Sequence, residues 1–294
     1  MKARLIYTIP IFAIAVTCYL YFSYSNVTKP IEAEKVKTTN YYNRIPILLF
    51  HNIDGQGQYA ISRLQFREHL EVLKNEKIQV LPLQTVYQML KHKKSADRPS
   101  VVITIDDDFK NIVRVAAPML REFQFPATFF VYTQNITDIP RQGMAWDDLR
   151  RLQREGFDIQ NHSHTHTQFH KQRIDESFSQ YEDRVTIEIT HSKQILEKEL
   201  GKSIWAFSYP FGYSSPYLEK RLKQAGYKLI LTTDANAPDT TKPFTAVVDR
   251  FTIQRNSHSS EYSSSNWKLF YHQIEIARQQ TSAESISYQI TPVN

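Results

Sequence analysis

The alternation of short apolar runs with amphipathic stretches between residues 45 and 253 constrains the fold of this chain more than any other feature. The apolar runs suit buried strands, and they occupy residues 45–50, 78–81, 101–105, 128–132, 157–160, 204–208, 227–232 and 250–253. Between them, apolar side chains recur three or four residues apart, as Phe66, Leu70 and Leu73 do, and a long amphipathic stretch covers residues 174–200. Strands and helices that alternate in this way predict an α/β fold with a parallel sheet.

The number of strand–helix units favours a closed barrel, with a doubly wound open sheet as the competing topology. After Arg255 the chain becomes rich in Ser and Gln. Beyond that point Trp267, Phe270, Tyr271 and Ile274 follow helical spacing, which predicts a helix packed on the barrel rather than one that binds a partner. We therefore expect a globular domain over residues 45–255 and a C-terminal tail over residues 256–294 that contains a helix.

The N-terminus carries the pattern of a membrane anchor. Lys2 and Arg4 precede a nearly uncharged apolar stretch over residues 5–25, and about 20 apolar residues cross a bilayer as a helix. The positive flank predicts that the rest of the chain lies outside the cytoplasm. A cleaved signal peptide is the alternative, but the apolar run continues through residues 19–22, where a small-residue cleavage site is needed. We expect an uncleaved anchor at residues 1–25, a polar linker at residues 26–44, and a periplasmic or cell-surface domain that is secreted if the anchor is cleaved.

Composition excludes some partners. The net charge of +6 suits an anionic surface, but no run of Lys and Arg is long enough to indicate nucleic acid binding. The single cysteine, Cys18, rules out an intrachain disulfide. Neither observation identifies a protein partner.

An acidic cluster directly follows one of the apolar strands. In the run Thr104-Ile105-Asp106-Asp107-Asp108, three carboxylates are adjacent. Like charges so close raise each other's pKa unless a cation or hydrogen bonds compensate. The run therefore indicates a metal site, with a solvated acidic turn as the alternative.

A histidine cluster lies further along the chain. His162, His164, His166 and His170 are four of the ten histidines and fall within nine residues. Imidazole nitrogens are good ligands for Zn²⁺ and similar ions, and residues four apart can bring both rings to one side of a turn or helix. A surface cluster without a ligand is the alternative.

These clusters follow the predicted strands in the same sense. Asp106 and Asp107 follow one strand, His162 follows another, and His51 and Pro210 follow two more. Active sites of β/α barrels lie at the C-terminal ends of the strands, so these side chains are predicted to point into one basin. A chance arrangement would scatter some of them to the opposite ends.

Several ordered motifs resemble those of the polysaccharide deacetylases with the nodulation-type homology domain, carbohydrate esterase family 4. The resemblance covers about residues 45–253 and rests on residues 46–51 (Pro-Ile-Leu-Leu-Phe-His), 102–107 (Val-Ile-Thr-Ile-Asp-Asp), 125–130 (Phe-Pro-Ala-Thr-Phe-Phe), 146–149 (Trp-Asp-Asp-Leu), 156–159 (Gly-Phe-Asp-Ile), 162–166 (His-Ser-His-Thr-His), 209–212 (Tyr-Pro-Phe-Gly) and 225–227 (Ala-Gly-Tyr). The resemblance implies a distorted (β/α) barrel of about seven or eight strands.

The resemblance also implies a metal site and a base. It assigns Asp107, His162 and His166 as ligands of one divalent ion, Zn²⁺ with Co²⁺, Ni²⁺ or Fe²⁺ as alternatives, and Asp106 as the catalytic base. His164, between the ligands, is not expected to bind the ion. Three protein ligands leave positions open for water and substrate. The ion would polarise an acetamide carbonyl and acidify a bound water, whose proton the base would take.

The substrate side of the site is implied in the same way. Tyr209, Pro210 and Phe211 form a loop expected to contact the substrate. A backbone N–H near Phe211 would help the ion to stabilise the oxyanion.

The sequence departs from the family pattern at three places. Asp108 stands where the family usually has Gly, so its carboxylate is expected to alter the loop and to perturb the base. Ser208 takes the place of an Arg that often orients the catalytic Asp, and Arg250 on the last predicted strand is a candidate substitute. No late motif supplies the customary general acid. His51 is the better candidate for that role and His258 the other, with a structural role for His51 as an alternative.

The sequence therefore predicts a membrane-anchored, metal-dependent hydrolase that removes N-acetyl groups from an amino-sugar polymer or glycan of the cell envelope. One alternative is a catalytically impaired relative that binds glycan or assists envelope assembly. Another is an O-acetyl esterase that acts on a polysaccharide. A metal phosphohydrolase is disfavoured, because no second metal site and no set of phosphate-binding Lys and Arg residues is visible.

Overall fold

The described part of the computed structural model comprises residues 42–136, 143–234, 236–248, 250–252 and 264–279. It contains one sheet of nine strands in the order β8-β7-β6-β5-β4-β3-β1-β9, with β2 paired to the start of β3 outside this path. Every pairing is parallel. The strands are β1 (Ile47–Phe50), β2 (Gln79–Val80), β3 (Ser100–Asp106), β4 (Thr128–Val131), β5 (Asp158–Asn161), β6 (Ala206–Ser208), β7 (Leu229–Leu231), β8 (Val247–Val248) and β9 (Phe251–Thr252).

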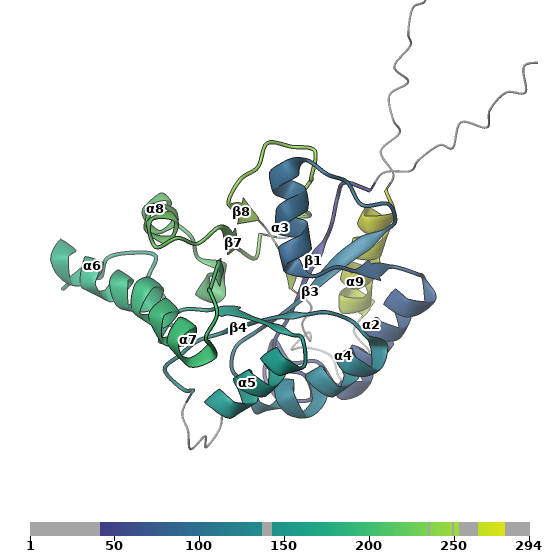
Figure 1. Cartoon of the computed structure of the whole chain (residues 1–294), viewed down its shortest axis with the longest axis horizontal. Coiled ribbons are helices and arrows are strands. Elements are labelled where there is room, and N and C mark those ends of the chain that lie inside the picture. The colour runs from purple at the N-terminus through teal and green to yellow at the C-terminus, as the bar shows by residue number, and fades with distance from the viewer. Residues whose placement is uncertain (1–41, 137–142, 235, 249, 253–263, 280–294) are drawn as a thin grey trace, which may run out of the picture. The chain divides into compact units, whose positions relative to one another are not determined.

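Helices flank the curled sheet (Figure 1). They are α2 (Arg63–Asn75), α3 (Leu83–His92), the π-helical turn η1 (Ile112–Ala116) continued by α4 (Ala117–Phe123), α5 (Trp146–Arg154), α6 (Phe178–Thr186) continued through the π-helical turn η2 (Ile187–His191) into α7 (Ser192–Leu200), the 3-10 turn η3 (Pro210–Gly212), α8 (Pro216–Gln224) and α9 (Ser264–Arg278). Ser62 and Ser177 begin α2 and α6 with capping boxes. The stretch predicted over residues 174–200 is thus a helix that begins at Phe178, and Ile174 is exposed.

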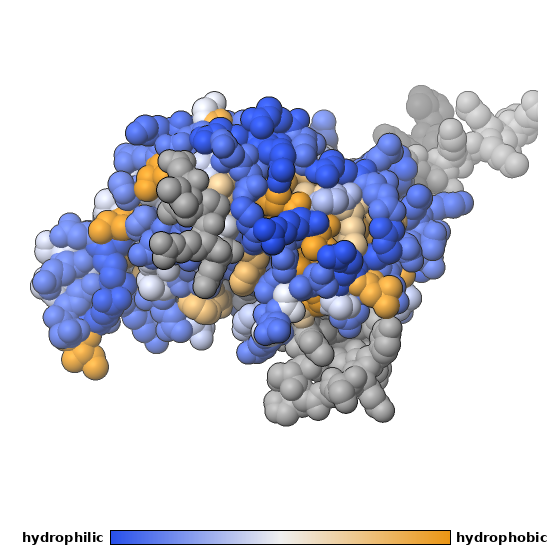
Figure 2. Space-filling view, turned by 90° about the horizontal axis from the view of Figure 1, so that it is seen from below, coloured by the Kyte–Doolittle hydropathy of each residue, from blue (hydrophilic) through white to orange (hydrophobic). Residues whose placement is uncertain are grey.

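Strand β3 shows how alternation along a strand divides the interior. Ile103 and Ile105 belong to the larger apolar core, which also contains the buried faces of α2, α4 and α5. Val102 belongs to a second core, and Thr104 and Asp106 share its side of the strand because successive side chains point to opposite faces. Both faces of the sheet are covered. The face of the molecule drawn in Figure 2 is mostly hydrophilic, with hydrophobic residues in separate patches.

The two edges of the sheet meet through the chain itself. Strands β8 and β9 stand at opposite ends of the strand order, yet only two residues separate Val248 from Phe251. Three residue steps span at most about 10 Å, so these edge strands lie close together. Strands β3 to β8 follow chain order in one direction, without the reversal that marks a doubly wound sheet. The curled parallel sheet with flanking helices fits the predicted distorted (β/α) barrel, and the two-residue strand β8 is the one that the sequence did not predict.

The packed domain begins before residue 45. Tyr42 and Ala96 exchange two backbone hydrogen bonds of 3.0 and 2.8 Å, and the Thr240 N–H donates to the Asn43 carbonyl at 2.8 Å. These positions, assigned to the linker by sequence, are part of the fold. The predicted anchor at residues 1–25 lies outside the described residues, and within the described ranges no helix is long and apolar enough to cross a bilayer.

The C-terminal helix is also part of the domain. In α9, Phe270 and Ile274 are 0% and 1% exposed and belong to the larger core, whereas Tyr271 is 47% exposed. The helix packs against the barrel, as its spacing predicts. The side chain of Trp267 lies outside the described part of the chain.

Replacing the buried side chain of Phe270 in α9 should therefore destabilise the whole barrel. We expect Phe270→Ala to lower the free energy of unfolding by about 3–5 kcal/mol, because a fully buried ring is removed from a packed core. Tyr271→Ala, one residue away on the exposed side, should cost less than about 1 kcal/mol. Urea denaturation measures both, and equal effects of the two substitutions would contradict the packing described.

Candidate active site

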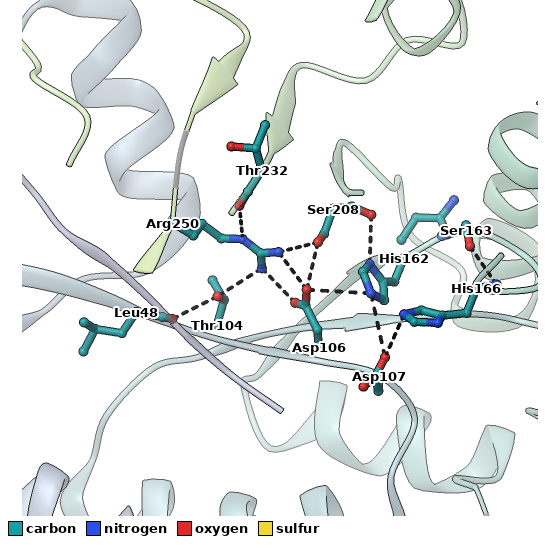
Figure 3. Close-up of polar contacts among 11 residues, drawn as sticks. Leu48, Thr104, Asp106, Asp107, His162, Ser163, His166, Ser208, Thr232 and Arg250 are labelled. Atoms are coloured by element: carbon teal, nitrogen blue, oxygen red, sulfur yellow. Dashed lines mark hydrogen bonds and ion pairs between the residues drawn. The ribbon is translucent and has the colours of Figure 1, made fainter. Parts of the chain in front are cut away.

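The carboxyl ends of five strands bring the predicted site residues together (Figure 3). Asp106 ends β3, Ser208 ends β6, and His51 and His162 directly follow β1 and β5. Arg250, placed on the last strand by sequence, lies just before β9 and shortly after the end of β8. Its position after β8 explains how its side chain reaches the same edge of the sheet as the others.

A buried ion pair joins Arg250 to Asp106. The Nη1 and Nη2 groups of Arg250 donate to Oδ1 and Oδ2 of Asp106 at 2.8 and 2.7 Å, and the two residues are 0% and 1% exposed. Arg250 also donates to the Thr232 carbonyl at 3.1 Å and to the Thr104 hydroxyl at 3.3 Å. The Ser208 hydroxyl accepts from Arg250 and donates to Asp106 at 2.9 Å. By the family resemblance, Ser208 takes the place of an Arg that often orients the catalytic Asp. Here Arg250 contacts the Asp instead, and Ser208 is one of its hydrogen-bond partners.

The ion pair fixes both the charge and the direction of the carboxylate. Burial alone would raise the pKa of Asp106, but the charge and hydrogen bonds of Arg250, together with smaller contributions from His162 and His51, hold the pKa below its usual range. Asp106 is therefore ionised at neutral pH, and two parallel hydrogen bonds from one planar group hold its orientation. Such a carboxylate is an acceptor that is ready to take a proton.

Three donor atoms converge beside this pair. The carboxylate of Asp107 and the rings of His162 and His166 offer atoms that all lie within 4.8 Å of one another. Asp107 Oδ1 is 3.3 Å from His166 Nε2 and 3.8 Å from His162 Nε2. This oxygen is buried and has no hydrogen-bond partner among the described residues. One carboxylate and two imidazoles at this separation fit a Zn²⁺ site that keeps an open position.

The protonation states also suit a metal. Burial and the charge of Asp106 raise the pKa of Asp107 to about 8, a conflict that a cation would relieve. Burial lowers the pKa of His162 to about 3, and it lowers the pKa of His166 as well, so both rings are neutral at pH 7. His162 Nδ1 is 2.8 Å from the Ser208 carbonyl. Because a carbonyl only accepts, Nδ1 carries the proton and Nε2 keeps its lone pair for a metal.

The other two histidines of the cluster lie apart from these atoms. His164 Nδ1 pairs with the Thr133 hydroxyl at 2.7 Å. The ring of His170 stacks on Tyr213 with 4.7 Å between centroids. Neither belongs to the set of converging donors.

The charge of Asp108 acts on its neighbour Asp107. Its carboxyl pairs with the Tyr132 hydroxyl, and its charge raises the pKa of Asp107, whereas burial and Arg250 chiefly set the pKa of Asp106. The expected perturbation of the base by Asp108 stays a prediction.

A cavity of about 330 Å³ opens over the site. All of the predicted site residues except Pro210 and Arg250 line it, and the second candidate acid, His258, lies outside the described residues. Tyr59 and Thr233 line it as well and were not predicted. Thr233 stands shortly after β7, so the rule that located the other residues could have found it, whereas Tyr59 lies in a loop without a pattern.

Three lining side chains shape the mouth and wall of the cavity. The ring of His51 lies 5.0 Å from that of Tyr59, and burial lowers the pKa of His51 to about 4. The Tyr209 hydroxyl is buried without a hydrogen-bond partner in the described part of the chain. Phe211 has a left-handed backbone with φ of 60° and a 48% exposed ring that lies 4.8 Å from His166. A strained, exposed aromatic residue at a cavity mouth is typical of a functional loop.

The converging donors should bind one divalent ion with a defined pH dependence. We expect Ala at Asp107, His162 or His166 to abolish Zn²⁺ binding, and His164→Ala to retain it. Below pH of about 8 the ion must displace a proton from Asp107, so the affinity should rise by about tenfold per pH unit and level off above that pH. Competition with a chromophoric chelator between pH 6 and 9 measures both effects, and a pH-independent affinity would contradict the assignment.

Loss of Arg250 should leave a buried carboxylate unpaired. We expect Arg250→Met to lower the free energy of unfolding by about 3–5 kcal/mol, and by less in an Asp106→Asn background, where no charge remains to be paired. Arg63→Met, which removes an exposed pair with Asp54, should cost less than about 1 kcal/mol. Equal effects of Arg250→Met in the two backgrounds, measured by urea denaturation, would show that the two charges do not depend on each other.

Comparison with known proteins finds similar sequences. The model of the family described as polysaccharide deacetylase matches residues 93–230. The poly-β-1,6-N-acetyl-D-glucosamine N-deacetylase of Staphylococcus aureus is 24% identical over 209 residues, which cover 69% of this chain and 71% of that protein.

Solved structures share the fold at low sequence identity. IcaB from Ammonifex degensii has a TM-score of 0.67 and 19% identity, and the match covers 81% of this chain and 98% of that one. The deacetylase PplD of Streptococcus pyogenes has a TM-score of 0.64 and 22% identity, with 72% and 93% covered. The prediction of a polysaccharide deacetylase from the sequence is confirmed, because the matching family model and the curated relative are both polysaccharide deacetylases and the solved structures share the fold.

Proposed function

We propose that this protein is a metal-dependent hydrolase that removes N-acetyl groups from an amino-sugar polymer of the cell envelope. The observation that carries the proposal is the meeting, in one cavity, of three converging donor side chains, those of Asp107, His162 and His166, with the ionised carboxylate of Asp106. The Staphylococcus aureus relative, named for its action on poly-β-1,6-N-acetyl-D-glucosamine, supports an acetylated glucosamine polymer as the substrate class.

The residues divide the work of hydrolysis between them. A divalent ion held by Asp107, His162 and His166 would supply Lewis-acid chemistry to the acetyl carbonyl and the attacking water. Asp106 takes the proton of that water, and its Oδ2 lies 3.7 Å from His162 Nε2, next to the metal ligands. Arg250 keeps this carboxylate ionised and correctly turned. The water oxygen adds to the acetyl carbon, the C–N bond breaks, and acetate and a free amine are released.

The leaving nitrogen needs a proton, and we assign its delivery to His51, which lines the cavity. Its pKa of about 4 makes the ring neutral at pH 7 in the free protein, so the proton that it delivers is the one that Asp106 has taken from the water. We assign the acetyl group to the Tyr209 hydroxyl, which has no hydrogen-bond partner among the described residues, and to the backbone of Phe211, which follows the buried Pro210 in η3.

The rim of the cavity favours a sugar. Tyr59 and Phe211 are 44% and 48% exposed, and each lies against a histidine of the site. The apolar C–H faces of sugar rings pack well on exposed aromatic rings. The cavity is lined by no Lys or Arg among the described residues, which weighs against a phosphate substrate.

We also propose that the domain works outside the cytoplasm, tethered by residues 1–25. The support is the positive flank ahead of the apolar stretch. An envelope polymer would be accessible to a domain held there.

Acetate release from a panel of acetylated polymers tests the proposal. We expect the Zn²⁺-loaded protein to release acetate from oligomers of β-1,6-linked N-acetylglucosamine, and a chelator to stop the reaction. Asp106→Asn should keep the metal and lower turnover by on the order of 10²-fold or more. Asp147→Asn, at a carboxylate that is 91% exposed, is the matched control and should be fully active.

Two outcomes would replace this function by one of its rivals. Metal-loaded protein that binds the oligomers without releasing acetate would identify a glycan-binding relative. Release only from O-acetylated polysaccharide would identify an esterase.

A further inference from the structure

Glu188 is a charged residue on the buried face of the long helix. It lies in the π-helical turn η2 and is 2% exposed, between the buried apolar side chains of Val185 and Ile189. A carboxylate in such a row is tolerated only where hydrogen bonds compensate for the loss of water. We propose that Glu188 is a positioning residue that holds the turn between His162 and His166 and thereby sets the metal affinity of the site. This inference rests on the metal site of the proposed function.

The donors that reach the carboxylate come from that turn. Glu188 Oε2 accepts from the backbone N–H of His164 at 3.0 Å and from that of Thr165 at 2.9 Å. Its other oxygen accepts from the Thr165 hydroxyl. Two successive N–H groups that point at one oxygen fix the orientation of two peptide planes, which lie between the two ligand histidines.

The turn has a backbone that needs such support. Ser163 and His166 have φ values of 80° and 56°, in the left-handed region that residues other than Gly rarely adopt. Within the turn, Ser163 donates to the Asn161 side chain at 2.9 Å, and the His166 N–H donates to the Ser163 hydroxyl at 3.1 Å. Unfavourable φ values persist where the surroundings over-determine the conformation, and Glu188 is a restraint that acts from another element.

The turn is held from two sides. Gln134, after β4, donates to the His164 carbonyl at 2.9 Å, while Glu188 accepts on the N–H side. The helix that carries Glu188 is tied to the end of β5, because the Ser192 hydroxyl donates to the Glu188 carbonyl at 2.6 Å and accepts from Asn161 at 2.7 Å. Removing the carboxylate would free one side of the turn, and the separation of the two ligand nitrogens would no longer be fixed. Partners of metal ligands commonly change affinity in this way.

Two conservative substitutions distinguish the position of the Glu188 side-chain oxygens from the negative charge that they carry. Glu188→Gln keeps an oxygen at the same distance for both N–H groups but loses the charge, and it should bind Zn²⁺ and Co²⁺ nearly as well as the wild type. Glu188→Asp keeps the charge but draws the oxygens back by one methylene. This variant and Glu188→Ala should bind both ions about 10–100-fold more weakly. Chelator competition on the full chain gives the dissociation constants, and the visible spectrum of bound Co²⁺ should shift in the Asp variant.

Glu197→Ala is the matched control, because this carboxylate on α7 also accepts a loop N–H, from Ile204 at 2.9 Å, away from the turn. It should leave metal affinity unchanged, and thermal unfolding in chelator reports any loss of fold in each variant. If the Ala variant does not fold, the Gln and Asp pair decides the question. Wild-type affinity and Co²⁺ spectrum in Glu188→Asp, or weak binding in Glu188→Gln, would overturn the role proposed for Glu188 but leave the metal site standing. A wild type that binds neither ion would overturn the metal site itself.

Discussion

The burial of the Asp106–Arg250 ion pair is the constraint to which the rest of the site conforms. Two charges taken out of water are tolerated only when they face each other and their remaining atoms are hydrogen-bonded. Their partners lie in β3 and β6 and directly after β7, and the Thr104 hydroxyl in turn donates to the Leu48 carbonyl of β1. The pair joins positions 144 residues apart. The strands that meet around it must therefore keep their places for either charge to remain satisfied.

Two neighbouring carboxylates acquire opposite properties because the backbone turns between them. Asp106 ends a regular strand and points inward to a guanidinium, which holds its pKa down. Asp107 has a φ of 77°, which breaks the strand and directs its oxygen to His162 and His166. Environments that push apart the pKa values of paired acids are a common basis for separate roles in hydrolysis. Here the separation is a consequence of where strand β3 stops.

Local patterns in the sequence were sufficient for much of this architecture. The strands around Asp106 and His162 are apolar runs with polar residues at their ends, so both the sheet and the basin could be predicted. The contact of Arg250 with Asp106 could only be guessed, since it depends on how a curled sheet closes over long sequence separations. The effect of Asp108 on the base stays a prediction, and the pairing of its carboxyl with the Tyr132 hydroxyl depends on tertiary packing that no local pattern reveals. Glu188 breaks the apolar row of its helix, which signals a buried charge, but nothing in the sequence identifies the turn that it binds.

Arg250 lies in the short connection between β8 and β9, and this has a consequence for how well sequence motifs describe a functional site. At a barrel edge where all strand ends converge, a guanidinium can arrive at the same point in space from more than one strand. A family signature written as a string of residues would score Ser208 as a lost arginine and the chain as defective. In the structure the positive charge is present, because Arg250 supplies it from the short connection between the two edge strands. What such a site requires is a positive charge at one location, and more than one position in the sequence can supply it.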